Sequence, residues 1–127
     1  MAEGLASETL VTIVDDDESV RESLPDLLNM LGFGARAFAS AEEFLDSEGI
    51  EETRCLLLDV AMPGMSGPEL QRYLVLHGQR IPIVFITARA DDAVREELLG
   101  QGAAACLFKP FSEQALRAAL DTALSKS

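Results

Sequence analysis

The chain has 127 residues, of which 48% are hydrophobic, a composition typical of one folded domain rather than of a disordered segment. Its formal net charge is −12 and it has no cluster of Lys and Arg, so this segment lacks the basic surface of a nucleic-acid binder. No apolar run approaches the roughly 20 residues of a membrane span, and the first residues lack the pattern of a signal peptide. We therefore expect a cytoplasmic protein that makes no membrane contact.

Apolar runs and helical periodicities alternate along the whole chain, without an internal linker or a low-complexity stretch. The sequence predicts, in order, strand 10–14, helix 18–31, strand 35–38, a short helix through residue 45, strand 55–58, helix 69–76, strand 81–87, helix 91–99, strand 104–108 and a last helix capped by Ser112. Pro82 cannot donate a hydrogen bond to a sheet, so it is expected at the beginning of its strand.

The helices have recognisable starts and buried faces. Capping-box spacing, a Ser with a Glu three residues later, occurs at three places: Ser19 with Glu22, Ser40 with Glu43, and Ser66 with Glu69. In the first helix one apolar face is formed by Val20, Leu24, Leu27, Leu28 and Leu31, and in the last by Leu116, Ala119, Leu120, Ala123 and Leu124.

Continuous apolar strands that alternate with helices indicate a parallel sheet covered on both faces. In such sheets ligands bind outside the carboxyl ends of the strands. Several charged or hydroxyl side chains fall at those ends: Asp15, Asp16, Asp17, Asp59, Thr87 and Lys109. Several acids with one amine favour a site for a hard cation and a phosphoryl group, and Mg²⁺ would relieve the repulsion between the carboxylates.

Four motifs, in this order, resemble the receiver domain of bacterial two-component response regulators: 14–17 (Val-Asp-Asp-Asp), 59–67, 86–88 and 109–111. The segment 39–45 further resembles the FixJ-type subgroup. The resemblance covers about residues 8–125 and implies that residues 1–127 form a single receiver domain. It also implies a flavodoxin-like (βα)5 three-layer sandwich with a parallel five-stranded sheet of order 2-1-3-4-5.

The resemblance assigns a role to each acid. Asp59 would be the phosphoacceptor, a carboxylate nucleophile that takes the phosphoryl group from a phosphohistidine. Mg²⁺ would be held by Asp16 directly, by Asp15 through water, by Asp59 and by the backbone carbonyl of Ala61. Asp17 is better interpreted as a cap or first-turn acid of the following helix than as a metal ligand.

The resemblance also implies how the signal is made. The Thr87 hydroxyl would donate to a phosphoryl oxygen, and Lys109, before a cis peptide bond to Pro110, would pair with the phosphoryl group or, before phosphorylation, with Asp59. The expected partner is a sensor histidine kinase, and the output is control of a further domain or partner, as in transcription regulation. The domain would be a regulatory phosphoacceptor rather than an enzyme, catalysing only its own phosphorylation and slow dephosphorylation.

Cys106 departs from the family pattern, because many receivers carry Tyr or Phe three residues before the lysine. Without that ring, signalling would rest on Thr87 and the loop after it, and Cys106→Tyr is expected to change the population of the active state. The resemblance places phosphorylation-dependent homodimerisation on the helix 4–strand 5–helix 5 face, residues 91–124. Strands three and five would lie about 9.6 Å apart, so Cys55 and Cys106 are expected to be free thiols.

Other functions fit the residues less well. A Mg²⁺-dependent phosphohydrolase of the haloacid dehalogenase type would need a second Asp two residues after the nucleophile, where this chain has Ala61. A flavodoxin-like flavin or nucleotide carrier needs a Gly- or Thr-rich phosphate loop after the first strand, where this chain has four acids. A phosphate-independent pseudo-receiver, a binding module, would not need the complete set of Asp59, Thr87 and Lys109.

Overall fold

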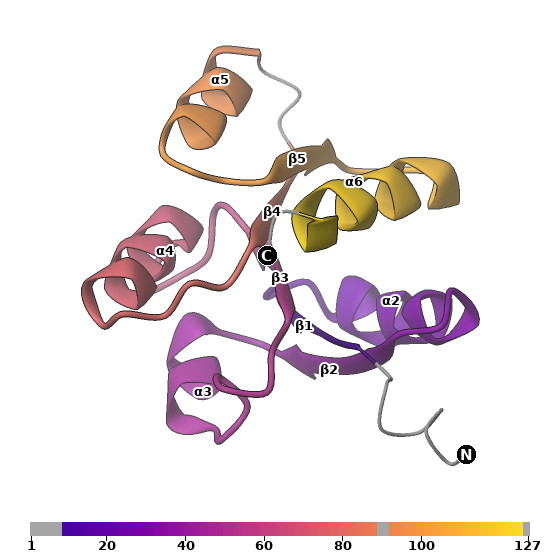
Figure 1. Ribbon diagram of the computed structural model, residues 1–127, viewed down its shortest axis with the longest axis horizontal. Coiled ribbons are helices and arrows are strands. Elements are labelled where there is room, and N and C mark those ends of the chain that lie inside the picture. Colours follow the sequence, from indigo (N-terminus) through magenta and orange to yellow (C-terminus); the bar gives the residue numbers. More distant parts are fainter. Residues whose placement is uncertain (1–8, 89–91, 126–127) are drawn as a thin grey trace.

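The computed structural model describes residues 9–88 and 92–125, which form a five-stranded parallel sheet between two layers of helices (Figure 1). In chain order the elements are β1 (Leu10–Val14), α2 (Glu18–Met30), β2 (Gly34–Phe38), α3 (Ala41–Asp46), β3 (Cys55–Asp59), α4 (Gly67–Leu76), β4 (Ile83–Thr87), α5 (Asp92–Gly100), β5 (Ala105–Phe108) and α6 (Glu113–Ser125). The strand order is β2-β1-β3-β4-β5, which confirms the flavodoxin-like sandwich.

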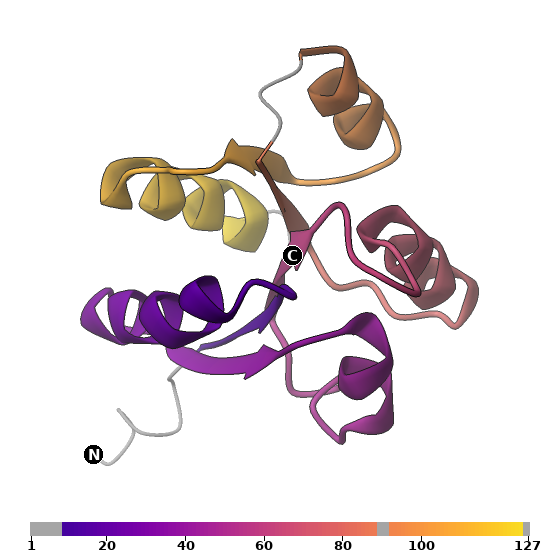
Figure 2. The ribbon, with the colours of Figure 1, turned by 180° about the vertical axis from the view of Figure 1, so that it is seen from behind.

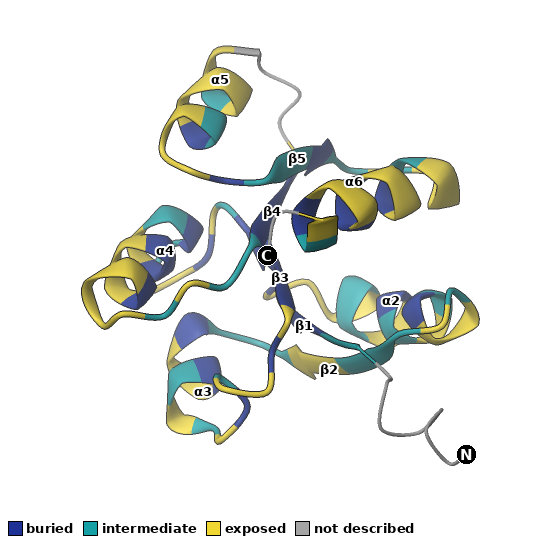
Figure 3. Cartoon of the chain, in the orientation of Figure 1, coloured by how far each residue is buried: buried dark blue, intermediate teal, exposed yellow. Residues whose placement is uncertain are grey.

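Each face of the sheet has its own hydrophobic core. Helices α2 and α6 cover one face and α3, α4 and α5 cover the other, as the two opposite views show (Figures 1 and 2). Neighbouring residues of β3 alternate between the cores, since Leu57 packs under α2 and α6 while Leu56 and Leu58 pack under the other layer. All five residues of β3 and of β4 are buried (Figure 3). Burial on both faces explains why these strands are continuous apolar runs.

Two of the three predicted capping serines are confirmed. Ser66 forms a complete capping box with Glu69, and the Ser40 side chain accepts a hydrogen bond from the Glu43 backbone N–H. The predicted box of Ser19 and Glu22 is wrong, because α2 begins at Glu18, as predicted, with Asp17 as its N-cap. Asp17 directly precedes the first turn, so its carboxylate accepts from a free backbone N–H of that turn, whereas Ser19 already lies inside the helix.

The element bounds differ from the prediction by one or two residues. Strand β4 begins at Ile83, after Pro82, whose carbonyl nevertheless accepts from the Leu56 N–H at 2.9 Å. Helix α4 begins at Gly67 and not at residue 69, with Pro68 in its first turn, where a missing N–H costs nothing. The predicted start of the next helix, Asp91, lies outside the described residues.

Three further expectations concern a cis peptide bond, the cysteines and membrane-spanning helices. The Lys109–Pro110 peptide bond is cis, as the resemblance implied. Cys55 on β3 and Cys106 on β5 are free thiols, separated in the sheet by β4, as predicted. Within residues 9–88 and 92–125, none of the helices has the length and apolar character that a membrane span requires.

Candidate functional site

The carboxyl ends of four strands bring the predicted site residues to one edge of the sheet. Asp15 follows β1, Asp59 ends β3, Thr87 ends β4 and Lys109 follows β5. The Lys109 backbone N–H donates to the Thr87 carbonyl at 2.8 Å, so the hydrogen-bond ladder continues past β5 and fixes the lysine beside β4. Asp59 and Thr87 are each only 6% exposed. The structure therefore gathers the site as the strand alternation predicted.

Three carboxylates form a cluster at this edge. One oxygen from each of Asp15, Asp16 and Asp59 lies within 4.8 Å of the others. Asp15 and Asp59 are buried, whereas Asp16 is exposed, so the cluster has a buried floor and an open side. Three like charges at this separation repel one another strongly unless a cation or protons neutralise them.

Asp15 forms the floor of the cluster and is completely buried. Its Oδ1 accepts a hydrogen bond from the Asp17 backbone N–H at 2.9 Å. Its Oδ2 forms an ion pair with Nζ of Lys109 at 2.9 Å, and no other donor among the described residues reaches this oxygen. A buried carboxylate oxygen with a single charged neighbour is a good ligand for a hard cation.

Lys109 forms its ion pair with Asp15, where the sequence predicted Asp59. The fully buried carboxylate of Asp15 needs a charge partner more than Asp59, which can lower its own charge by binding a proton. Burial of the ammonium works to lower the pKa of Lys109, but the contact with Asp15 and the charges of Asp15 and Asp59 outweigh burial and raise it. The lysine is therefore a permanent cation beside the cluster.

Asp59 is the acid whose protonation is most strongly perturbed. Burial, followed by the negative charge of Asp15, raises the pKa of Asp59 to about 7, although the charge of Lys109 opposes this effect. The metal-free site therefore holds Asp59 near the midpoint of its titration at neutral pH. A cation bound among the carboxylates would favour the charged, nucleophilic form.

The residues fit an oxygen-coordinated divalent cation. Carboxylate oxygens from three acids converge, and the exposed Asp16 leaves one side open to water. Ala61 is exposed in the loop after β3, and its carbonyl accepts no hydrogen bond from the described residues. This set of a few oxygen ligands with an open side suits Mg²⁺, which retains several waters.

Asp17 is the N-cap of α2, as its preferred interpretation predicted. Its carboxylate accepts hydrogen bonds from the Ser19 backbone N–H at 3.0 Å and from the Ser19 hydroxyl at 2.8 Å. These hydrogen bonds hold the pKa of Asp17 below its usual value. The carboxylate of Asp17 is thus engaged in capping α2 and is separate from the cluster of Asp15, Asp16 and Asp59.

Cys106 lies on the face of β5 opposite to Leu107. Leu107 belongs to the core under α2 and α6, whereas Cys106 packs against the core under α3, α4 and α5. Burial raises the pKa of the Cys106 thiol. A half-buried neutral thiol therefore occupies the position where the family pattern has an aromatic ring.

Sequence reasoning missed two contacts around the site. Nη1 of Arg21 donates to the Asp15 carbonyl at 3.0 Å, which ties the loop after β1 to α2. Oε2 of Glu42 accepts from the Met65 backbone N–H at 3.0 Å, which ties α3 to the loop after β3. The partners are 6 and 23 residues apart, and no spacing rule joins a side chain to a backbone group at such separations.

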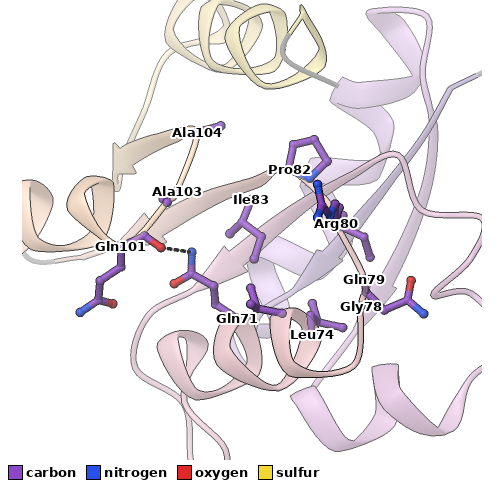
Figure 4. Close-up of a pocket in the computed structure, with 13 residues that line it drawn as sticks. Gln71, Leu74, Gly78, Gln79, Arg80, Pro82, Ile83, Gln101, Ala103 and Ala104 are labelled. Atoms are coloured by element: carbon purple, nitrogen blue, oxygen red, sulfur yellow. Dashed lines mark hydrogen bonds between the residues drawn. The ribbon is translucent and has the colours of Figure 1, made fainter.

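The structure also has a cavity away from the acidic cluster. It has a volume of about 730 Å³ and is lined by residues such as Leu74, Ile83 and Ala104, with Nε2 of Gln71 donating to the Gln101 carbonyl at 3.4 Å (Figure 4). Ile83 begins β4 and Ala104 precedes β5, so this cavity lies at the amino ends of the strands. It contains none of the clustered acids, and the chemistry belongs to the opposite edge.

A doubly wound parallel sheet that gathers charged side chains at its carboxyl edge defines a class of α/β proteins that bind their ligands at that edge. Within that class the chain belongs to the response regulators, because the family model "Response regulator receiver domain" matches residues 11–121. It is therefore a receiver domain of two-component signalling systems, a family of signalling proteins rather than dedicated enzymes.

Named relatives agree with the family. The response regulator protein TmoT of Ectopseudomonas mendocina is 41% identical over 117 residues, which are 92% of this chain and 53% of TmoT. The transcriptional regulatory protein FixJ of Azorhizobium caulinodans is 38% identical over 117 residues, 92% of this chain and 56% of FixJ. The chain thus spans about half the length of these curated relatives.

Solved structures show the same fold. The response regulator StyR has a TM-score of 0.84 and 45% identity, with 94% of this chain and 61% of that chain covered. The crystal structure of FixJ-N has a TM-score of 0.83 and 36% identity, with 95% of this chain and 97% of that chain covered. The similarity to FixJ agrees with the subgroup that segment 39–45 indicated.

Proposed function

We propose that this domain is a phosphorylation-dependent switch that accepts a phosphoryl group on Asp59 from a phosphohistidine of a sensor kinase. The observation that carries this proposal is the position of Asp59, buried at the end of β3 and within 4.8 Å of two further carboxylates. Phosphoryl transfer depends mainly on positioning and on charge neutralisation, and both are properties of this cluster.

The carboxylate of Asp59 is the nucleophile. One of its oxygens forms the new bond to phosphorus while the bond between phosphorus and the imidazole nitrogen breaks. The electron pair of that bond leaves with the imidazole, and the product is an acyl phosphate on the protein. Because the pKa of Asp59 is raised to about 7 without a cation, neutralisation of the neighbouring charges favours the ionised nucleophile.

Mg²⁺ is the proposed cofactor, held by Asp15, Asp16, Asp59 and the backbone carbonyl of Ala61. When bound, it supplies positive charge to the carboxylates and to the transferring phosphoryl oxygens. Neutralisation of Asp15 weakens its hold on Lys109, whose ammonium lies 2.9 Å away and can then pair with the phosphoryl group. The Thr87 hydroxyl, at the end of β4, donates to another phosphoryl oxygen.

The domain acts on a downstream partner or output domain and carries the receiver function within residues 1–127. Two of its relatives are named transcriptional regulatory proteins, which supports a role in transcription regulation. A cavity of about 470 Å³ lies between α2 and the segment of Lys109, Pro110 and Phe111, and leaves room for the donor to approach beside Lys109. A phosphorylation-dependent homodimer through the α5–β5–α6 face is part of the proposal.

Phosphoramidate tests the chemistry, since its bond between phosphorus and nitrogen imitates that of phosphohistidine. Wild-type protein incubated with phosphoramidate and Mg²⁺ should acquire a phosphoryl group that hydroxylamine removes, as it does from acyl phosphates. The reaction should require Mg²⁺ and should be lost in Asp59→Asn. A hydroxylamine-resistant phosphate, or equal labelling of Asp59→Asn, would contradict the assignment of the nucleophile.

A further inference from the structure

The loop between β3 and α4, residues 60–66, carries the Ala61 carbonyl and is closed at its base. The Gly67 N–H donates to the Val60 carbonyl at 3.0 Å, and the Ser66 N–H donates to Oε1 of Glu69 at 2.8 Å. Both hydrogen bonds join the loop to residues close to it in the chain, and they fix its two ends. The segment between these ends, which includes Ala61, needs another support.

Glu42 supplies a contact from a distant part of the chain. Its Oε2 accepts a hydrogen bond from the Met65 backbone N–H at 3.0 Å. The same oxygen lies against Gly64, where an added Cβ would be 2.9 Å from Oε2 and where φ is +77°. Glycine at this position thus permits both the turn and the close approach of the carboxylate.

Helix α3 holds Glu42 in a fixed position. Ala41 and Phe44 are completely buried, so both neighbouring turns of the helix are anchored in the core. The Ser40 side chain accepts from the Glu43 backbone N–H at 3.1 Å, which caps the start of the helix. With its backbone fixed in this way, Glu42 supports the loop from a rigid element.

We propose that Glu42 is a positioning residue that holds the β3–α4 loop in the conformation that presents the Ala61 carbonyl to the cation. This inference rests on the proposed function, because Ala61 acts only if Mg²⁺ binds at the cluster. Glu42 acts through the Met65 N–H and touches no reacting atom. Met62, buried in the same loop, supports it independently, so loss of Glu42 weakens the site without abolishing it.

The test compares Glu42→Ala and Glu42→Gln with the control Glu43→Ala. The control removes the same charge from the next residue. It also removes a hydrogen bond from a backbone N–H to a carboxylate, but the donor is Ala39, whereas the donor to Glu42 is Met65. In metal-free protein, Glu42→Ala should accelerate hydrogen exchange of the Met65 amide about 3- to 10-fold, as expected for one lost hydrogen bond. Glu42→Gln keeps an acceptor oxygen and should restore most of the protection.

The same variants are then titrated with Mg²⁺ by calorimetry and phosphorylated at saturating Mg²⁺. Glu42→Ala should raise the dissociation constant for Mg²⁺ roughly 3- to 10-fold and leave the saturated phosphorylation rate close to wild type. Glu43→Ala should match wild type in Mg²⁺ affinity. An unchanged dissociation constant in Glu42→Ala, or an equal loss in Glu43→Ala, would overturn the role of Glu42.

Failure of the proposed function can be distinguished from failure of the role of Glu42. Wild-type protein that takes up neither Mg²⁺ nor a phosphoryl group would refute the proposed function and, with it, the role of Glu42 toward the cation. This holds even if hydrogen exchange of the Met65 amide is faster in Glu42→Ala. Wild-type protein that binds Mg²⁺ and is phosphorylated, with Glu42→Ala equal to it in affinity, would refute only the role of Glu42.

Discussion

Gly67 is the first residue of α4 and packs directly against the end of the strand that carries Asp59. A Cβ at this position would overlap the backbone carbonyl oxygen of Asp59, and it would lie 3.0 Å from a ring carbon of Phe85 and 3.1 Å from the Cα of Val60. Two of these three neighbours are backbone atoms, which cannot rotate away. We therefore expect Gly67→Ala to displace the end of β3.

The size of the effect follows from this geometry. Separating Cβ from the Asp59 carbonyl requires a backbone shift on the order of 1 Å. Overpacking of a buried position costs about 1–3 kcal/mol, against which the helix preference of Ala over Gly returns up to about 1 kcal/mol. A displacement of about 1 Å in a reacting group can slow its reaction about 100-fold. Gly67→Ala should lose about 1–2 kcal/mol of stability and phosphorylate about 10- to 100-fold more slowly.

Gly100→Ala is the matched control. Gly100 is the last residue of α5, has no atom within 4 Å of an added Cβ, and does not adopt a left-handed φ. The substitution should leave the phosphorylation rate unchanged and the stability equal or slightly higher. Urea unfolding and the rate of phosphorylation by acetyl phosphate are the two assays. Equal stability and equal rate in Gly67→Ala and Gly100→Ala would refute the close packing behind Asp59.

Three further substitutions test the site and its supports. Because the folded-state pKa of Asp59 is raised from 3.8 to about 7, ionisation of this group opposes folding as the pH rises through that range. Metal-free Asp59→Asn should therefore be more stable than wild type at pH 8, by at most about 4 kcal/mol. This difference in stability should vanish near pH 4 and should become smaller when Mg²⁺ is added. Unfolding curves that show no pH dependence of this difference would contradict it. Lys109→Met leaves the buried Asp15 without its charge partner, so the free energy of unfolding of metal-free protein at pH 7 should fall by about 2–3 kcal/mol. Addition of Mg²⁺ should restore part of this stability. A loss of stability that Mg²⁺ leaves unaltered would count against a cation at Asp15. Ser66→Ala removes the N-cap of α4 and should cost about 1 kcal/mol in urea unfolding, and an unchanged midpoint would show that the capping box is not stabilising.

The sequence was sufficient for the fold because its strands are buried on both faces. Runs such as 55–58 and 83–86 are apolar without interruption, and only a covered parallel sheet explains that pattern between helices. Parallel alternation then places every strand's carboxyl end at one edge, which is why Asp15, Asp59 and Lys109 could be grouped before any coordinates were known. The strand order itself came from the family resemblance, since alternation alone is compatible with several orders.

The pairing within the site could not be predicted because it depends on burial. Asp15 is completely buried and forms the ion pair with Lys109 that the sequence assigned to Asp59, which keeps a small exposed fraction. The sequence offered two candidates for the cap of α2, Ser19 by its spacing to Glu22 and Asp17 by its position, and the structure selects Asp17. Contacts such as that of Glu42 with Met65 depend on how two loops meet, and no local pattern contains that information.

The central claim is that Asp59 accepts a phosphoryl group with the help of Mg²⁺. The most direct measurement is the intact mass of wild type and Asp59→Asn after treatment with acetyl phosphate, each with Mg²⁺ and with a chelator. We expect wild type to gain the mass of one phosphoryl group only with Mg²⁺, and Asp59→Asn to gain none. No added mass on wild type with Mg²⁺, or the same added mass on Asp59→Asn, would contradict the account.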